Sequence, residues 1–256
     1  MTDLVVAADV GKRFGGLQAL SAVSFTIRAG EIYGLIGPNG AGKTTLFNVL
    51  TGIYAPDAGS FTFAGAPLAG LKPHEVTARG IARTFQNIRL FANLSALENV
   101  MIGRHVRTRA GVVGAILRDR ATREEESAIE RRARELLNYV GIAQRANDAA
   151  GSLPYGDQRR LEIARALATD PTLLALDEPA AGMNSTETAA LKPLLERIRS
   201  GGVTILLIEH DVKLVMGVCD RVLVLDRGEK LTEAPPADVQ RDPKVIEAYL
   251  GAPIEA

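Results

Sequence analysis

The stretch GPNGAGKT, residues 37–44, decides the fold of this chain because it fits the pattern G-x-x-x-x-G-K-[ST]. It follows EIYGLIG (31–37), an apolar run that predicts a strand, and it opens TTLFNVLTG (44–52), whose period predicts a helix ended by Gly52. Between a strand and a helix, glycines let the backbone wrap so that N–H groups point at phosphate oxygens. We therefore predict a phosphate-binding loop. The alternative, a glycine-rich turn with a chance lysine, leaves the complete motif unexplained.

The loop also supplies two side chains for a nucleotide. Lys43 can reach β- and γ-phosphates, and the Thr44 hydroxyl can ligate Mg²⁺. The dipole of the following helix adds to the attraction for phosphate. We expect the phosphates of a nucleotide and Mg²⁺ as ligands.

Composition narrows the class of protein. The chain has 256 residues, 46% of them apolar, and its 30 basic and 30 acidic side chains give no net charge. A neutral chain is a poor candidate for broad nucleic-acid binding, so we expect no nucleic-acid partner. The single Cys219 excludes an intrachain disulfide and favours a reducing compartment. With an acid near its start and no apolar run of about 18 residues, the chain is expected to be soluble and able to dock on a membrane protein.

The order of elements indicates an α/β protein. VSFTI (23–27) and GSFTFAG (59–65) predict strands at the beginning of the chain. TLLALDE (172–178) and VTILLIE (203–209) predict buried strands, and helices are predicted over 161–168, 185–200 and 242–251, with a hairpin over 221–233. Continuous apolar strands that alternate with helices predict a largely parallel sheet covered on both faces.

The stretch 87–150 differs because it contains almost no strand signal. Residues 122–141 predict an amphipathic helix, with Thr122 and Glu125 as a capping box. Its apolar stripe comprises Ile129, Ala133, Leu136, Leu137 and Val140. We predict a helical subdomain inserted into the α/β core. Within it, AGVVGAIL (110–117) is expected to be either a partner-facing patch or a minor core helix.

Four polar residues leave predicted strands. Asp177 and Glu178 end TLLALDE; the first suits a Mg²⁺ contact, and the second is placed to activate water. Gln86 ends the predicted strand IARTFQ (81–86), and His210 leaves VTILLIE toward the same edge as Glu178. Without the phosphate-binding loop, these would be ordinary surface residues at strand ends. We expect His74 and His105 to be structural.

LPYGDQRR (153–160) precedes the helical run LEIARALA. Pro154 suits a position in the first turn of a helix, where a missing N–H costs nothing, and Asp157 also suits the first turn. The stretch is thus expected to begin a helix.

The set of motifs resembles one family. GPNGAGKT, Gln86, LPYGDQRR, TLLALDEP, AAGMN and IEHD occur in the order and context of the ATP-binding subunit of ABC transporters, over essentially the whole chain. RFGGLQAL, DEPAAGMN, the long segment 104–126 and VIEAYLG are most similar to the branched-chain amino-acid uptake group. The resemblance implies one nucleotide-binding domain, 1–256, of the α/β class. Its P-loop NTPase core would comprise 1–86 and 151–256, with an N-terminal antiparallel β subdomain and a helical subdomain at 87–150.

The resemblance also implies roles for residues. Glu178 would be the general base, His210 would hold it in register with the γ-phosphate, and Gln86 would contact Mg²⁺ and the attacking water and sense the membrane partner. Phe14 would stack on adenine, with a core aromatic as the alternative. The implied metal contacts are Thr44, Gln86 and Asp177. The implied nucleotide contacts are Phe14, Gly37, Pro38, Asn39, Gly40, Ala41, Gly42, Lys43, Thr44, Thr45 and, in the signature segment, Leu153, Pro154, Tyr155, Gly156 and Asp157.

The implied assembly has two ATPase subunits, identical or related, arranged head to tail. Each ATP would lie between the phosphate-binding loop of one subunit and LPYGD of the other. Two transmembrane permease subunits would hold the pair at the cytoplasmic face of the inner membrane, with an external substrate-binding protein as an indirect partner. ATP would close the dimer, and hydrolysis would reopen it to power import of branched-chain or related amino acids.

Two departures from the family pattern lead to a hypothesis. The usual signature is Leu-Ser-Gly-Gly-Gln, but Pro154 has no hydroxyl and Asp157 adds negative charge. The following loop is AGMN (181–184) rather than Ser-Ala-Leu-Asp. We hypothesise a weaker grip on the γ-phosphate, which would depend on backbone N–H groups near Gly156 and on the helix dipole.

Two other functions fit parts of the pattern. The ATPase of a lipopolysaccharide-type exporter has a similar length. A soluble ABC-type mechanical ATPase acting on DNA or the ribosome is disfavoured, because the insert lacks sustained heptads and the chain has room for one cassette.

Overall fold

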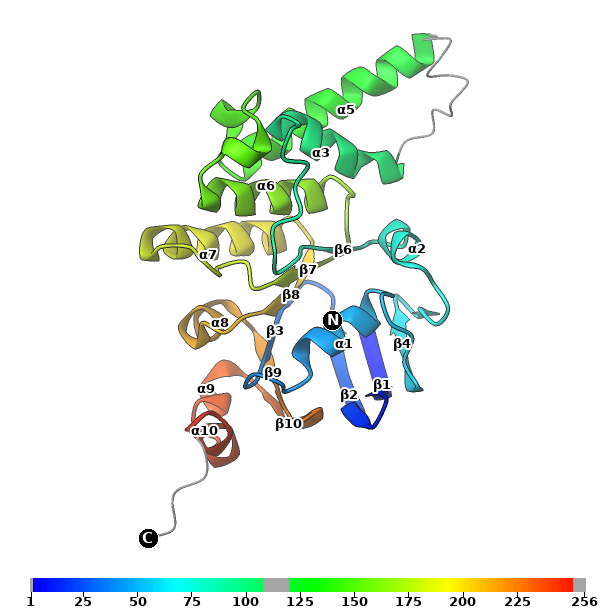
Figure 1. Ribbon diagram of the computed structural model, residues 1–256, viewed down its shortest axis with the longest axis vertical. Coiled ribbons are helices and arrows are strands. Elements are labelled where there is room, and N and C mark those ends of the chain that lie inside the picture. The colour runs from blue at the N-terminus through cyan, green and yellow to red at the C-terminus, as the bar shows by residue number, and fades with distance from the viewer. Residues whose placement is uncertain (1, 108–119, 251–256) are drawn as a thin grey trace.

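The computed structural model describes residues 2–107 and 120–250, and it contains two sheets (Figure 1). The larger has the order β10-β9-β3-β8-β7-β6, parallel throughout except for the β9–β10 hairpin. Its strands are β3 Ile32–Ile36, β6 Ile81–Arg83, β7 Leu173–Asp177, β8 Thr204–Ile208, β9 Arg221–Asp226 and β10 Glu229–Ala234. The smaller, antiparallel sheet has the order β2-β1-β4-β5, formed by β1 Asp3–Phe14, β2 Leu17–Arg28, β4 Ala58–Phe63 and β5 Ala66–Pro67.

The helices form layers around the larger sheet (Figure 1). The α-helices are α1 Lys43–Leu50, α2 Pro73–Ala78, α3 Ala96–Arg104, α5 Arg120–Tyr139, α6 Tyr155–Leu167, α7 Ser185–Ser200, α8 Val212–Val218, α9 Pro236–Val239 and α10 Pro243–Leu250. The short 3-10 helices are η1 His105–Arg107, η2 Ala143–Arg145 and η3 Ala150–Ser152. The predicted fold class, an α/β core with an antiparallel β part and helices from the inserted stretch, is confirmed.

Alternate residues of the parallel strands enter two separate cores. On β3, Ile32 and Ile36 pack in the core shared with α6, α7 and α8, while Tyr33 and Leu35 pack in the core shared with α1 and the antiparallel sheet. Side chains alternate between the two faces of a strand, so a strand covered on both faces must be apolar throughout. The continuous apolar runs predicted this arrangement correctly.

Helices α3, α5 and α6 pack together at one end of the molecule (Figure 1). The predicted stripe is confirmed, because Ala133, Leu136, Leu137 and Val140 of α5 are buried, and Ile129 is partly buried. The predicted capping box at Thr122 is wrong, because α5 includes Arg120 and so Thr122 lies inside the helix. Arginine and alanine at 120 and 121 are good helix formers, and nothing there stops the helix. The stretch AGVVGAIL lies outside the described residues.

Two predicted boundaries shift by one to three residues. Strand β6 ends at Arg83 rather than at Gln86. The backbone N–H of Asp177 donates at 3.2 Å to the Thr84 hydroxyl instead of to a backbone carbonyl, so the hydrogen-bond ladder between β6 and β7 stops at this point. Pro154 precedes α6 as its N-cap, with extended ψ of 149°, rather than occupying a position in the first turn. The predicted helix over 185–200 is confirmed; Asn184 caps it and accepts the N–H groups of Thr186 and Glu187.

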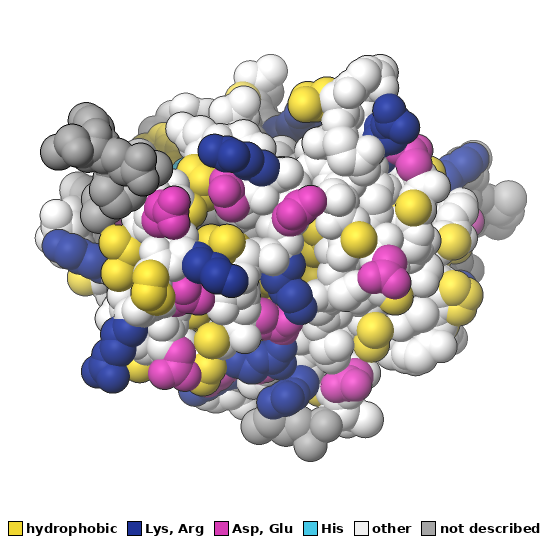
Figure 2. All heavy atoms as spheres, turned by 90° about the horizontal axis from the view of Figure 1, so that it is seen from below, with side chains coloured by type: hydrophobic (Ala, Val, Ile, Leu, Met, Phe, Trp, Pro, Cys, Tyr) yellow, Lys and Arg dark blue, Asp and Glu magenta, His cyan; other side chains and the backbone are white. Residues whose placement is uncertain are grey.

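Among the described residues, no helix is both long enough and apolar enough to cross a membrane. The face seen in Figure 2 carries basic and acidic side chains intermingled, without a field of one sign.

The packing of α5 against the core generates a stability prediction. Leu137 is fully buried, and we expect Leu137→Ala to lower the free energy of unfolding by about 2–5 kcal/mol, because it removes apolar contacts and leaves a cavity. Urea unfolding measures the change. Leu17 is 67% exposed, so Leu17→Ala is the matched control. Equal stability of the two variants would contradict the placement of α5.

Candidate functional site

A cleft of about 560 Å³ opens where β3 passes into α1. The residues after β3, β6, β7, β8 and β9 that line it lie at the carboxyl edge of the parallel sheet, the edge at which α/β sheets bind ligands, and the end of β1 and the start of β2 from the antiparallel sheet complete its wall. The lining residues are Phe14, Leu17, Gln18, Ala19, Asn39, Gly40, Ala41, Gly42, Lys43, Thr44, Thr45, Gln86, Glu178, His210 and Arg227. The structure thus gathers most of the predicted site residues in one place.

The loop Gly37–Gly42 requires glycine for steric reasons. A Cβ on Gly37 would lie 2.2 Å from the carbonyl oxygen of Leu225, a contact that no side chain tolerates. Gly42 has φ of 99°, in the left-handed region, and directly precedes α1. The backbone N–H groups of the loop therefore lie at the N-terminus of a helix, where they can bind an anion.

Lys43 is buried and held by its own loop. Its Nζ donates hydrogen bonds to the carbonyl oxygens of Gly37 at 2.7 Å and Pro38 at 2.9 Å. Burial lowers the pKa of the ammonium group, while the charges of Glu178 and Asp177 act in the opposite direction. None of the described carboxylates forms an ion pair with Lys43, so a phosphate would supply a direct counter-charge to this buried cation.

Glu178 is fixed from two sides. Its Oε2 accepts a hydrogen bond from Nε2 of Gln86 at 2.9 Å, and its Oε1 lies 2.7 Å from Nε2 of His210. Its backbone has φ of 50°, a strained conformation for a residue with a side chain. The carboxylate is therefore placed by three parts of the fold: the ends of β7 and β8 and the segment after β6.

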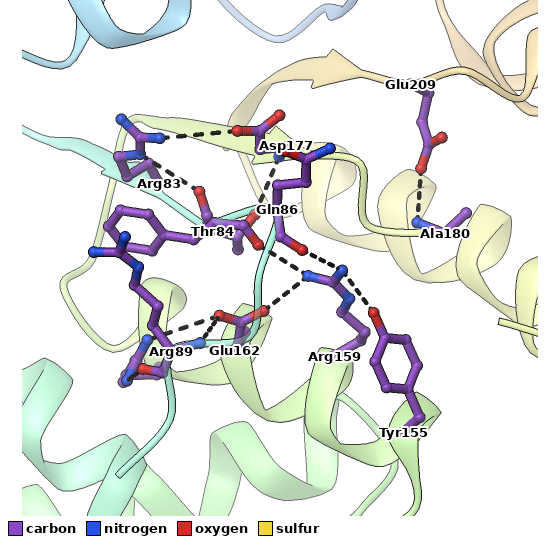
Figure 3. A network of polar contacts seen from close by, with 12 residues as sticks. Arg83, Thr84, Gln86, Arg89, Tyr155, Arg159, Glu162, Asp177, Ala180 and Glu209 are labelled. Atoms are coloured by element: carbon purple, nitrogen blue, oxygen red, sulfur yellow. Dashed lines mark hydrogen bonds and ion pairs between the residues drawn. The ribbon is translucent and has the colours of Figure 1, made fainter. Parts of the chain in front are cut away.

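Asp177 is buried and does not line the cleft. Its carboxylate Oδ2 lies 3.8 Å from Nη2 of Arg83, and Figure 3 shows the two side chains facing each other. Burial raises the pKa of this carboxyl group, and the Arg83 charge acts in the opposite direction.

The chemistry of the donors suits Mg²⁺. Thr44, Gln86 and Asp177 offer hydroxyl, amide and carboxylate oxygens, which are the ligands that this ion prefers. Within the described part of the chain, no group of three or more His, Cys, Asp or Glu side chains could hold a metal ion. Phosphate oxygens would have to complete the coordination shell.

Glu209 supports the site from outside the cleft, and no motif in the sequence indicates this role. Its carboxylate is buried and accepts the backbone N–H of Ala180 at 2.7 Å and that of His210 at 3.1 Å (Figure 3 shows the Ala180 bond). It thereby ties the loop after Glu178 to the turn that carries His210. The only available sequence signal was an acidic residue at the end of a buried strand, in IEHD.

Phe14 lies on the rim of the cleft and is 42% exposed. Its ring contacts Tyr54 edge to face, with centroids 5.3 Å apart. The alternative of a core aromatic is therefore wrong. Leu17, Gln18, Ala19 and Arg227 extend the same rim and were not predicted.

The signature segment 153–157 does not line this cleft. Leu153 and Gly156 are buried, whereas Pro154 and Tyr155 are exposed at the start of α6. Asp157 lies 3.6 Å from Nε of Arg145, so part of its negative charge is offset. The structure thus separates the predicted site into a cleft and a helix start that lies outside it.

The cleft, its loop and the acidic pair define a P-loop nucleotide-binding protein. A profile of the ABC transporter family matches residues 20–181, and one described as branched-chain amino acid ATP-binding cassette transporter matches residues 229–255. The chain belongs to the ABC transporter family, as an ATP-binding cassette, the ATPase type that drives transport.

Curated relatives cover nearly the whole chain. LivG of Salmonella typhimurium, a high-affinity branched-chain amino acid transport ATP-binding protein, is 46% identical over 93% of this chain and 94% of its own length. BraF of Pseudomonas aeruginosa, with the same description, is 44% identical over the same shares. LptB of Escherichia coli, the ATP-binding protein of a lipopolysaccharide export system, is 34% identical over 96% and 97%.

Solved structures agree with the fold. The ADP conformation of an ATP-binding cassette of an ABC transporter has a TM-score of 0.85 and 30% identity, covering 98% of this chain and all of that one. A dimeric cassette in a post-hydrolysis state, bound to ADP and Pi, has a TM-score of 0.77 and 27% identity, covering 91% and 99%.

The buried Glu209 carboxylate predicts a dependence of stability on pH. Burial raises its pKa in the folded protein above the ordinary 4.5, against the three backbone N–H groups that bind it. The folded protein therefore holds this proton more tightly than the unfolded chain, and the resulting stabilisation is lost as pH rises through the raised pKa. Glutamine cannot lose a proton. We expect the free energy of unfolding of the wild type, minus that of Glu209→Gln, to fall as the pH rises from the ordinary pKa of 4.5 through the raised pKa of Glu209.

Denaturant unfolding of both proteins at each pH measures this difference. Glu247→Gln, at an exposed position on α10, is the control and should change stability by less than about 0.5 kcal/mol. A difference between wild type and Glu209→Gln that stayed constant or grew with pH would contradict the prediction.

Proposed function

We propose that this chain is the ATP-hydrolysing subunit of an importer of branched-chain or related amino acids. The observation that carries the hydrolytic role is the Glu178 carboxylate, held between Gln86 and His210 beside the phosphate-binding loop. The substrate class is supported by the descriptions of LivG and BraF and by the match over residues 229–255.

The proposed reaction is attack of water on the γ-phosphate of ATP. Glu178 accepts a proton from the water, and the bonds from Gln86 and His210 hold its carboxylate in one orientation. Lys43 and the loop N–H groups bind phosphate oxygens, and Phe14 stacks on adenine at the rim. Bound Mg²⁺, held by Thr44, Gln86 and Asp177, would neutralise phosphate charge.

The active form is proposed to be a head-to-tail dimer, with itself or with a related ATPase subunit. The cleft contains a phosphate-binding loop but not the segment 153–157, so a second subunit would have to bring that segment to the ATP. That a solved cassette with this fold is described as dimeric and bound to ADP and Pi supports the formation of a dimer.

Permease subunits are proposed to bind a second groove, of about 520 Å³, beside the segment that carries Gln86. It lies between α2, α3 and α6, and apolar Ile53, Phe91, Ile102 and Val106 on its walls are exposed. Binding there would hold the chain at the cytoplasmic face of the membrane and place the partner next to Gln86. An external substrate-binding protein would act through the permease.

Export of lipopolysaccharide is the second candidate, because LptB matches the chain over nearly its full length. The higher identity to LivG and the match over residues 229–255 favour import. Purification of the tagged chain from membranes of its own cells, with identification of the attached permeases, tests the choice. Amino-acid permeases support import, and lipopolysaccharide-export permeases would overturn it.

The role of Glu178 predicts the behaviour of Glu178→Gln. We expect this variant to bind ATP like the wild type and to hydrolyse it about 10²–10⁴-fold more slowly, because an amide cannot accept the proton of water. Nucleotide-binding titrations and phosphate-release assays measure the two properties. Glu229→Gln, exposed at the start of β10, is the control. Near-normal hydrolysis by Glu178→Gln would refute the assignment.

The weaker-grip hypothesis predicts a gain for Pro154→Ser. A serine at this N-cap offers a hydroxyl to the γ-phosphate, so we expect ATP-driven dimerisation at lower ATP concentration. A serine cap also stabilises the helix by about 1 kcal/mol. Pro154→Asn is therefore the control for capping without a hydroxyl, and Pro154→Ala is the control that adds neither a cap nor a hydroxyl. Light scattering during an ATP titration measures dimerisation. Unchanged dimerisation and ATPase rate in Pro154→Ser would show that the hypothesis is wrong.

A further inference from the structure

Arg159, on α6, is a buried arginine that binds the segment carrying Gln86. Its guanidinium donates to the carbonyl oxygen of Phe85 at 2.9 Å and to that of Gln86 at 2.6 Å. The same group also donates to the hydroxyl of Tyr155 at 2.8 Å. Figure 3 shows Arg159 between Gln86 and Tyr155, so one planar group fixes the backbone of one segment and a side chain of another.

Glu162 makes this burial possible. Both Arg159 and Glu162 are almost fully buried, and Nη1 of Arg159 lies 3.2 Å from Oε2 of Glu162. The other carboxylate oxygen accepts the N–H of Arg89 at 3.0 Å. A buried ion pair adds little net stability compared with apolar side chains of similar size. It does fix the relative positions of the two charged groups, because each needs the other as its counter-charge. The pair therefore holds residues 85–89 at a defined position on α6.

Tyr155 connects this cluster to the molecular surface. It is 42% exposed at the start of α6, within the signature segment 153–157. Its ring also packs on Gly182, in the loop after Glu178; a Cβ on that glycine would lie 2.8 Å from Cε1 of the tyrosine ring. A ligand covering the segment 153–157 would thus contact a side chain that is bonded to Arg159.

The contacts continue into the hydrolytic site. The backbone of Gln86 is held by Arg159, while its side-chain amide holds Glu178. A displacement of Tyr155 therefore changes the support of the carbonyl of Gln86, and a displacement of Gln86 changes one of the two contacts that orient Glu178. The cleft and the signature segment, which are separate on the surface, share this one chain of hydrogen bonds.

We propose that Tyr155 and Arg159 are positioning residues that tie the hydrolytic site of a subunit to the signature segment which it presents to the ATP of its partner. This inference rests on the proposed dimer. ATP bound by the partner fixes Tyr155, Arg159 then holds Gln86 against Glu178, and each subunit hydrolyses its ATP fastest when its signature segment is covered. The two ATP sites are thereby coupled.

Tyr155→Phe tests the coupling, because it removes only the hydroxyl. We expect cooperative hydrolysis in the wild type, and in the variant a Hill coefficient for ATP close to 1 and a kcat about tenfold lower, the size expected for one lost hydrogen bond to a charged group. The full-length chain is assayed over a range of Mg-ATP concentrations. Tyr139→Phe, at the end of α5 and outside the cluster, is the matched control and should keep the wild-type Hill coefficient.

Arg159→Lys is the second variant. Lysine keeps the charge that Glu162 requires but cannot present a planar fork to two carbonyls and a hydroxyl, so we expect the same loss of cooperativity. If both residues act through one chain of contacts, the double variant should be no worse than the more damaged single variant, and the effects should be non-additive. Circular dichroism confirms that each variant is folded before its kinetics are compared.

The possible outcomes separate this inference from the proposed function. A non-cooperative wild type, a Tyr155→Phe variant with unchanged Hill coefficient and kcat, or fully additive effects would overturn the inference and leave the hydrolytic role intact. A wild-type chain without ATPase activity would instead overturn the proposed function.

Discussion

The Glu178 carboxylate is held by one hydrogen bond from Gln86 and by one contact with His210, and most of the fold serves to keep these three residues together. Each comes from a different strand connection at the carboxyl edge of the parallel sheet. The strands β7 and β8 pair in register from Leu173–Thr204 to Asp177–Ile208, which brings Glu178 and His210 out at the same level. Gln86 arrives from the end of β6, which pairs with β7 on the other side.

Buried charge is concentrated at this edge of the sheet and on the adjoining helix α6. The buried charged residues there include Lys43, Asp177, Glu162 and Glu209. Burial disfavours the charged form of each, so it lowers the pKa of Lys43 and raises the pKa of the three carboxyl groups. Such charges are costly unless each one finds a counter-charge or several hydrogen-bond donors. Arg159 neutralises Glu162, and backbone N–H groups solvate Glu209. Within the described part of the chain, the hydrogen bonds of Lys43 go only to carbonyl oxygens of its own loop, so a bound phosphate would offset the cost of burying this charge.

The sequence predicted the fold well where a pattern has a single physical cause. Continuous apolar runs predicted strands covered on both faces, and GPNGAGKT predicted the loop and helix at the cleft. Local signals failed for two different reasons. The Thr122 capping box was overridden by another local signal, the good helix formers before it, whereas β6 ended before Gln86 because of a tertiary contact of the Thr84 side chain. Nothing local could show that Glu209 ties two loops, or that Arg159 and Tyr155 share a hydrogen bond, because these contacts join distant segments or depend on burial.

The central claim is that this subunit carries half of each of two ATP sites, with the cleft on one surface and the segment 153–157 on another. A crystal structure of the Glu178→Gln variant with Mg²⁺ and ATP tests it most directly. We expect a dimer in which each ATP contacts the loop 37–44 of one subunit and the segment 153–157 of the other. An ATP enclosed by one subunit alone, with the segment 153–157 facing solvent, would contradict it.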